Sequence, residues 1–103
     1  MTTFYLAPFI AGEREWGLQT FGPGRRTADI VAHIKRELDE EIVANPDDAY
    51  EWIDVIMLGI AGAWRAGLSP AEICEGLVAK AAINRSRSWP AWQPEDVVTE
   101  HLR

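Results

Sequence analysis

The stretch ELDEEIVANPDDAYEWID, residues 37–54, decides how we interpret the fold of this chain. It holds two groups of acidic residues on either side of an Asn-Pro pair, which a helix interior does not accommodate. The acids that we single out are Glu37, Glu40 and Glu41 in the first group and Glu51 and Asp54 in the second. Within each group they recur at helical spacing, so they share one face of a helix. The sequence therefore predicts two consecutive helices that present carboxylates.

Asp54 is the most informative of these acids, because it lies inside the apolar run Trp52–Leu58. We expect a buried helix here, in which an ionised carboxylate must be paired or must bind a metal ion. Glu51 has an ordinary alternative, because Asp48 and Glu51 fit a capping box at the start of the same helix. That alternative does not explain Asp54, which lies one turn further along the helix.

The composition is that of one globular domain, and we treat residues 1–103 as a single domain. The net charge of −6 argues against binding nucleic acid without regard to its sequence, which needs a basic surface, but suits an acidic site neutralised by a divalent cation. The single cysteine, Cys74, excludes an intrachain disulfide and favours an intracellular setting. No apolar run is long enough to cross a bilayer, so we expect a soluble, cytoplasmic protein.

The remaining sequence predicts an all-α, four-helix-type bundle. Residues 1–26 show no clear period. They are expected to form a short extended or helical arm that ends in a loop over residues 20–26, where Gly-Pro-Gly interrupts regular structure. Clear helices are predicted from Thr27 or Asp29 to Asn45, from about Asp48 to Arg65, and from a capping box at Ser69-Pro70-Ala71-Glu72 to Trp89-Pro90, with a short last helix over residues 95–102.

Apolar residues recur at helical spacing and predict which faces are buried. The expected stripes are Ile30, Ile34, Leu38 and Ile42 in the first clear helix, and Ile73, Leu77 and Ala81, with Val78, in the third. The helix over residues 48–66 is too apolar for a surface helix, so we place it at the centre of the bundle or at a subunit interface. We therefore expect a homodimer or a dimer of dimers.

Carboxylates from two helices form a cage of oxygen ligands, which suits Mg²⁺ or Mn²⁺. Zinc is not favoured, because His33 and Cys74 have no partners at ligand spacing. Lys80, Asn84 and Arg87 form a polar, basic strip that supplies cations for phosphate oxygens, although such a strip is more often a solvated helix end. From spacing alone, metal-dependent phosphate chemistry and a non-catalytic helical module that binds nucleotide or protein both remain open.

The acidic motif Glu37-x-x-Glu40 followed by Glu51-x-x-Asp54 resembles that of the all-α nucleoside triphosphate pyrophosphohydrolases, the MazG and dimeric dUTPase superfamily. The resemblance is closer to its dATP/dGTP pyrophosphohydrolase branch, the MazG-like domains of the phage MazZ type. The shared features are Thr20-Phe21-Gly22-Pro23-Gly24, His33-Ile34-x-x-Glu37-Leu38, Glu51-Trp52-Ile53-Asp54-Val55-Ile56, Gly62-Ala63-Trp64-Arg65-Ala66-Gly67, Lys80-x-x-x-Asn84-x-x-Arg87-x-Trp89-Pro90 and Glu100-His101.

This resemblance implies hydrolysis of a purine (deoxy)nucleoside triphosphate, with dGTP or GTP as the leading expectation, to the monophosphate and pyrophosphate. Enzymes of the MazZ type are thought to supply dGMP in phages that replace adenine with 2-aminoadenine, and a phage-encoded chain would act in the host cytoplasm. The implied metal ligands are Glu37, Glu40, Glu51 and Asp54, with Glu41 as a substitute for Glu40, and Glu37 or Glu40 is the implied general base.

The resemblance also implies that Lys80 and Arg87 hold the triphosphate and that Asn84 contacts the sugar or base. Ala61 stands where related sequences often have an acid, and Arg36 where many have a further acid before Glu37, and both departures bear on the number of metal ions.

Other candidate binding residues have ordinary alternatives. His33 borders the acidic face and can contact the base or a metal-bound water, but we favour a hydrogen bond to a neighbouring acid. Trp16, Phe21, Trp89 and Trp92 can stack on a purine, although a core or interface role is the more common one for each.

Overall fold

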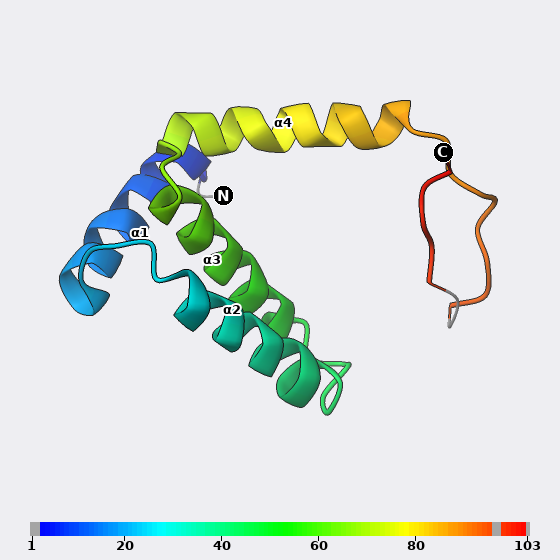
Figure 1. The fold of residues 1–103 in the computed structure, drawn as a ribbon, viewed down its shortest axis with the longest axis horizontal. Coiled ribbons are helices and arrows are strands. Elements are labelled where there is room, and N and C mark those ends of the chain that lie inside the picture. Colours follow the sequence, from blue (N-terminus) through cyan, green and yellow to red (C-terminus); the bar gives the residue numbers. More distant parts are fainter. Residues whose placement is uncertain (1–2, 96–97, 103) are drawn as a thin grey trace.

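The computed structural model describes residues 3–95 and 98–102 and is built of helices (Figure 1). Their bounds are α1 Leu6–Phe21, α2 Thr27–Arg36, a π-helical turn η1 Glu37–Ile42 that continues α2, α3 Tyr50–Arg65 and α4 Pro70–Ser86. Within the described residues, β pairing is limited to an isolated bridge between Ser88 and Leu102. The predicted all-α, four-helix-type fold is therefore confirmed. None of the described helices is long and apolar enough to span a membrane.

Helix α3 is the central element, because α1, α2, η1 and α4 all contact it. Helices α2 and α3 run side by side in opposite directions and are joined by the turn that contains Asn45-Pro46 (Figure 1). Helix α4 packs on α1 and α3 near its start and then extends away from the bundle (Figure 1). It contacts neither α2 nor η1. The two acidic helices are therefore neighbours, whereas the far half of α4 stands apart from them.

The hydrophobic core lies where α1, α3 and α4 meet. Ile10 is completely buried, and Trp64 and Ile73 are nearly so. Partly buried apolar side chains surround these three residues, namely Leu6, Phe9, Ile60, Ala61, Ala63 and Cys74. Since Ile10 comes from α1, the N-terminal segment contributes to the core itself.

The N-terminal arm expected over residues 1–26 is instead mostly a 16-residue helix, α1. Thr20 and Phe21, which we assigned to the loop, are its last residues, and the loop starts at Gly22. The helical period was obscured by small residues, one of which has a packing role. A Cβ atom on Gly17 would lie 3.0 Å from Cζ2 of Trp64, so glycine lets α1 approach this indole.

The helix starts differ in how well the sequence predicted them. Helix α4 has the predicted capping box, in which Ser69 Oγ accepts from the backbone N–H of Glu72 and the Glu72 carboxylate accepts from that of Ser69. This hydrogen bonding lowers the pKa of Glu72. Helix α2 has no side-chain cap, because Arg26 precedes it in a left-handed conformation (φ 50°). Asp29 pairs instead with the guanidinium of Arg26 at 3.1 Å.

Two faces that we expected to be buried are exposed in the single chain. On α3, Trp52, Ile53 and Ile56 are each about half exposed. On α4, Ile73 is buried but Leu77 and Val78 are exposed, because the helix leaves the bundle after its first turns. The expectation of burial was therefore wrong for these positions of the single chain.

The predicted last helix is wrong for the residues that can be judged. Residues 98–102 are not helical, while residues 96–97 lie outside the described part. The segment folds back so that the backbone N–H of Leu102 donates to the carbonyl of Ser88, and the ring of His101 meets that of Trp89 edge-on. The indole of Trp89 in turn donates to the backbone carbonyl of Asn84 at 2.7 Å.

Arg65, the last residue of α3, holds the end of α1 and the following loop in place. Its Nη1 donates to the carbonyls of Gly22 and Gly24 at 2.9 and 3.0 Å, and its Nη2 donates to that of Gly17 at 3.2 Å. Its guanidinium also lies 4.3 Å from the centroid of the Trp64 ring. Carbonyls at a helix C-terminus lack helical partners, so a cation is favoured here.

We expect Arg65→Ala to lower the free energy of unfolding by roughly 2–3 kcal/mol, because three carbonyls lose a charged donor. Urea unfolding should show a lower midpoint with an unchanged slope. The matched control is Arg85→Ala at an exposed position of α4, which should change stability by less than about 0.5 kcal/mol. Equal effects of the two substitutions would contradict the anchoring role.

Candidate metal centre and adjoining cavity

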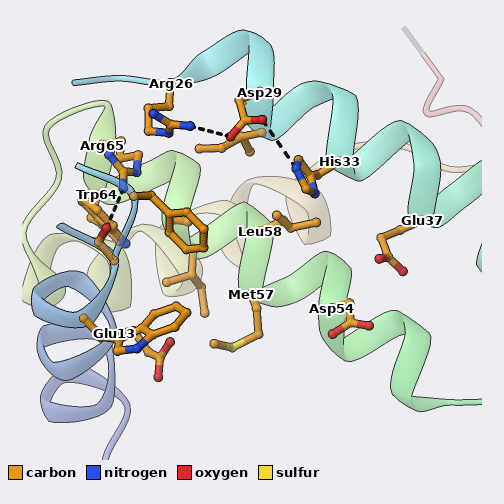
Figure 2. A pocket seen from close by; sticks show the side chains of 16 residues that line it. Glu13, Arg26, Asp29, His33, Glu37, Asp54, Met57, Leu58, Trp64 and Arg65 are labelled. Atoms are coloured by element: carbon orange, nitrogen blue, oxygen red, sulfur yellow. Dashed lines mark hydrogen bonds and ion pairs between the residues drawn. The ribbon is translucent and has the colours of Figure 1, made fainter. Parts of the chain in front are cut away.

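Three carboxylates from two helices converge at one point. Glu37 opens η1, whereas Glu51 and Asp54 lie one turn apart on α3. One oxygen from each lies within 4.8 Å of the others. Figure 2 shows Glu37 and Asp54 on facing helices. The pairing of the two acidic groups across the Asn-Pro turn, which spacing suggested, is thus present in the fold.

No basic side chain among the described residues pairs with this cluster. Partial burial raises the pKa of Glu51, and hydrogen bonding to Glu37 and repulsion from Glu37, Glu41 and Asp48 raise it further. Oε2 of Glu37 is buried and has no hydrogen-bond partner among the described residues. The salt bridges found in the described part of the chain join Asp29 to Arg26 and His33 and do not involve the cluster. Such a set of oxygen donors fits a hard divalent cation.

The surroundings of the α3 acids differ in two ways from those we expected. Asp54 is exposed rather than enclosed by apolar side chains: it lies near Glu37 and Glu51, and the apolar neighbours Trp52, Ile53 and Ile56 are themselves about half exposed. Glu51 is also not hydrogen-bonded back to Asp48, whose backbone N–H donates to Asn45 and whose side chain accepts from Tyr50. The capping-box alternative for Glu51 is therefore not formed, and its carboxylate turns to the cluster.

The π-helical turn changes the relation between the two adjacent glutamates. In η1 each hydrogen bond spans five residues rather than four, so side chains spaced for an α-helix are rotated relative to one another. Glu41 is half-buried and close enough to raise the pKa of Glu51, whereas Glu40 is exposed and is not among the causes of that shift. The structure thus brings Glu41 nearer to the cluster than Glu40.

A cavity of about 370 Å³ adjoins the cluster and runs toward α1 (Figure 2). Its size is that of a small-molecule site. It is lined by Glu13, Trp16, Gly17, Phe21, Arg26, Asp29, Ile30, His33, Glu37, Asp54, Met57, Leu58, Ile60, Ala61, Trp64 and Arg65. Glu13, Arg26 and Arg65 were not among our candidates, and recognising α1 as a helix would have placed Glu13 and Gly17 on one face four residues apart.

His33 lines this cavity and contacts an acid of its own helix. Its Nε2 lies 3.5 Å from Oδ1 of Asp29, whose other oxygen pairs with Arg26. His33 therefore lies beside a neighbouring acid as expected, although at ion-pair distance and not in a hydrogen bond, and its position in the cavity keeps it within reach of a ligand.

The predicted basic strip is not brought to the acidic cluster within one chain. Lys80, Asn84 and Arg87 are exposed on the far half of α4 and just beyond it, where Arg87 Nη1 donates to Asn84 Oδ1 at 3.3 Å. Trp89 packs beside this strip, and Trp92 is almost fully exposed. Trp16 and Phe21, in contrast, line the cavity, with ring centroids 5.5 Å apart.

The sequence of this chain is similar to that of a known protein family. No curated protein and no solved structure matches this chain significantly. The sequence model of the dATP/dGTP pyrophosphohydrolases matches residues 9–102, a range that includes both acidic groups, the cavity and α4. The chain therefore belongs to the dATP/dGTP pyrophosphohydrolase family.

Proposed function

We propose that this chain hydrolyses a purine (deoxy)nucleoside triphosphate, preferring dGTP or GTP, to the monophosphate and pyrophosphate with the help of Mg²⁺ or Mn²⁺. The family establishes the class of reaction, hydrolysis of a nucleotide anhydride that releases pyrophosphate. The observation that carries the proposed metal dependence is the convergence of Glu37, Glu51 and Asp54 without a balancing cation in the described residues.

The carboxylates have two roles in the proposed chemistry, metal binding and activation of water. Glu37, Glu51 and Asp54 would hold the ion, which would supply charge stabilisation of the phosphate oxygens and acidify a bound water. Glu37, with its unpartnered Oε2, or the exposed Glu40 would orient the attacking water and accept its proton. The water oxygen forms a bond to phosphorus as the bond to the bridging oxygen breaks, and pyrophosphate leaves.

Two residues, Glu40 and Glu41, are candidates for the fourth acid of the site, each for a different reason. Glu40 is the residue that the family motif indicates, whereas Glu41 is the one that lies closer to Glu51. Glu41 therefore takes this role as long as η1 keeps its π-helical turn.

The basic strip can complete the site only from a second copy of the chain, and we include a homodimer, or a dimer of dimers, in the proposal. Helix α4 contacts neither α2 nor η1 of its own chain, so Lys80, Asn84 and Arg87 do not adjoin their own acids. The exposed apolar side chains on α3 and α4 provide surface for such an assembly. In the assembly, Lys80 and Arg87 would hold the triphosphate and Asn84 the sugar or base, with Trp89 beside them.

The reaction is tested with a panel of dGTP, GTP, dATP and pyrimidine nucleotides in Mg²⁺, with pyrophosphate and orthophosphate measured separately. We expect pyrophosphate and a monophosphate from the purine nucleotides, and none after addition of a chelator. Asp54→Asn should lose more than about 100-fold in activity while remaining folded, because a direct ligand should matter more than its supporting partners.

The matched control is Asp39→Asn, at an exposed residue of η1 outside the cluster, which should keep its activity. Orthophosphate as the sole product would contradict the reaction. Trace release that is equal for all nucleotides would favour the alternative, a non-catalytic module that binds nucleotide or protein. The exposed apolar faces of α3 and α4 are the observation that supports this alternative.

Glu51→Gln should abolish activity and yet stabilise the metal-free protein at pH 7. The raised pKa of Glu51 means that the folded state favours its protonated form, so this residue lowers the free energy of unfolding as the pH rises through the folded pKa. The stabilisation by Glu51→Gln should disappear below the ordinary glutamate pKa of about 4.3, where both states are protonated. Thermal unfolding in chelator at pH 7 and pH 3.5 measures this.

Addition of Mg²⁺ should raise the melting temperature of the wild type more than that of Glu51→Gln, because the ion stabilises only a site that can bind it. A variant that is less stable than the wild type at both pH values would show that Glu51 is structural and not strained by its neighbours.

Completion of the site by a second copy is tested by mixing two inactive variants, Asp54→Asn and Arg87→Ala, under conditions that let subunits exchange. If acids and basic strip come from different chains, one site of a mixed dimer has both intact, and activity should return. If both come from the same chain, every site stays defective and the mixture remains inactive.

A further inference from the structure

The cavity has an acidic end and an aromatic end, and the two are joined by one wall of α3. Along α3 this wall runs from Asp54 through Met57 to Ala61, a rise of about 10 Å at 1.5 Å per residue. Figure 2 shows Glu37 and Asp54 at one end, Glu13 toward α1 at the other, and Met57 between them. A nucleotide whose phosphates lie at the carboxylate cluster would therefore direct its base along α3 toward α1.

The α1 end of the cavity has the character of a base-binding site. Trp16 and Phe21 provide aromatic rings set edge to face, and Met57 adds an adaptable apolar contact. Glu13 is the acidic side chain that α1 contributes to this lining, and it is half-buried. A carboxylate beside rings accepts hydrogen bonds from the edge of a base whose faces the rings contact.

Glu13 has no partner among the described residues, unlike the other charged residues of the lining outside the carboxylate cluster. No hydrogen bond or salt bridge in the described part of the chain involves it, whereas Arg26, Asp29 and His33 are joined to one another and Arg65 is bound to backbone carbonyls. Its carboxylate is therefore available to a ligand without breaking an existing interaction.

We infer that Glu13 selects guanine over adenine by accepting hydrogen bonds from the base, an inference that rests on the proposed function. Guanine has two adjacent donors, N1–H and the 2-amino group, and one carboxylate can accept from both. Adenine has an unprotonated acceptor at N1, which repels a carboxylate placed there. The residue thus binds the base and takes no part in cleavage of the anhydride.

The test measures kcat/KM for dGTP, dITP and dATP with the wild type, Glu13→Gln and Glu15→Gln. The wild type should prefer dGTP over dITP, which keeps N1–H but lacks the 2-amino group, and dITP over dATP. Glu13→Gln should lower kcat/KM for dGTP roughly 10- to 100-fold, as expected for a two-bond base contact. It should not lower kcat/KM for dATP, because a carboxamide can donate to N1 and accept from the 6-amino group. Glu15→Gln is the matched control on an exposed position of α1 outside the cavity, and it should keep the wild-type order.

Equilibrium binding of dGMP and dAMP provides a second measurement that needs no turnover. Glu13→Gln should weaken dGMP binding by a similar factor without weakening dAMP binding, and it should leave the melting temperature unchanged. If the wild type releases pyrophosphate but Glu13→Gln keeps the wild-type ratios of dGTP, dITP and dATP, the inference is overturned and the proposed function stands. If the wild type hydrolyses no nucleotide, the proposed function fails, and unaltered preference for dGMP over dAMP in Glu13→Gln then overturns the inference on its own.

Discussion

The convergence of Glu37, Glu51 and Asp54 on one point is the feature on which the candidate site depends. The three carboxylates are held together by the packing of α2 and η1 on α3, which begins at a turn that Pro46 forces on the chain. Of the predicted stripe on these helices, Ile42 is buried and Ile30 and Ile34 are partly buried, whereas Leu38 is exposed and the prediction was wrong there. Partial burial, the hydrogen bond with Glu37 and repulsion from neighbouring acids together raise the pKa of Glu51.

One face of helix α3 contributes to the candidate site, and the opposite face is available for the proposed assembly. One face presents Asp54 and lines the cavity, while the other presents Trp52, Ile53 and Ile56 to the outside. The end of the same helix is fixed by Trp64 in the core and by Arg65, which binds the carbonyls at the end of α1. The aromatic end of the cavity therefore depends on the same interactions that hold α1 in the bundle.

In the proposed site, the acidic metal ligands, the base-binding residues and the phosphate-binding residues come from different helices. The acids come from the hairpin of η1 and α3, the aromatic wall and Glu13 come from α1 and its end, and the basic strip comes from α4. Because α4 extends away from its own acids, the site of a single chain contains the first two parts and lacks the third. Assembly would thus bring further cations to the carboxylate cluster, which pairs with no basic side chain among the described residues.

The sequence by itself determined the features that depend on local spacing and backbone chemistry. The Asn-Pro turn between two acidic helices and the capping box at Ser69 follow from a few neighbouring residues. The family assignment follows from motifs spread over residues 9–102. Only the tertiary structure decided that residues 6–21 form a core helix, that η1 favours Glu41 over Glu40, and that Glu13 reaches the cavity. These outcomes depend on contacts such as that of Gly17 with Trp64, which join residues far apart in the chain and therefore leave no mark in local periodicity.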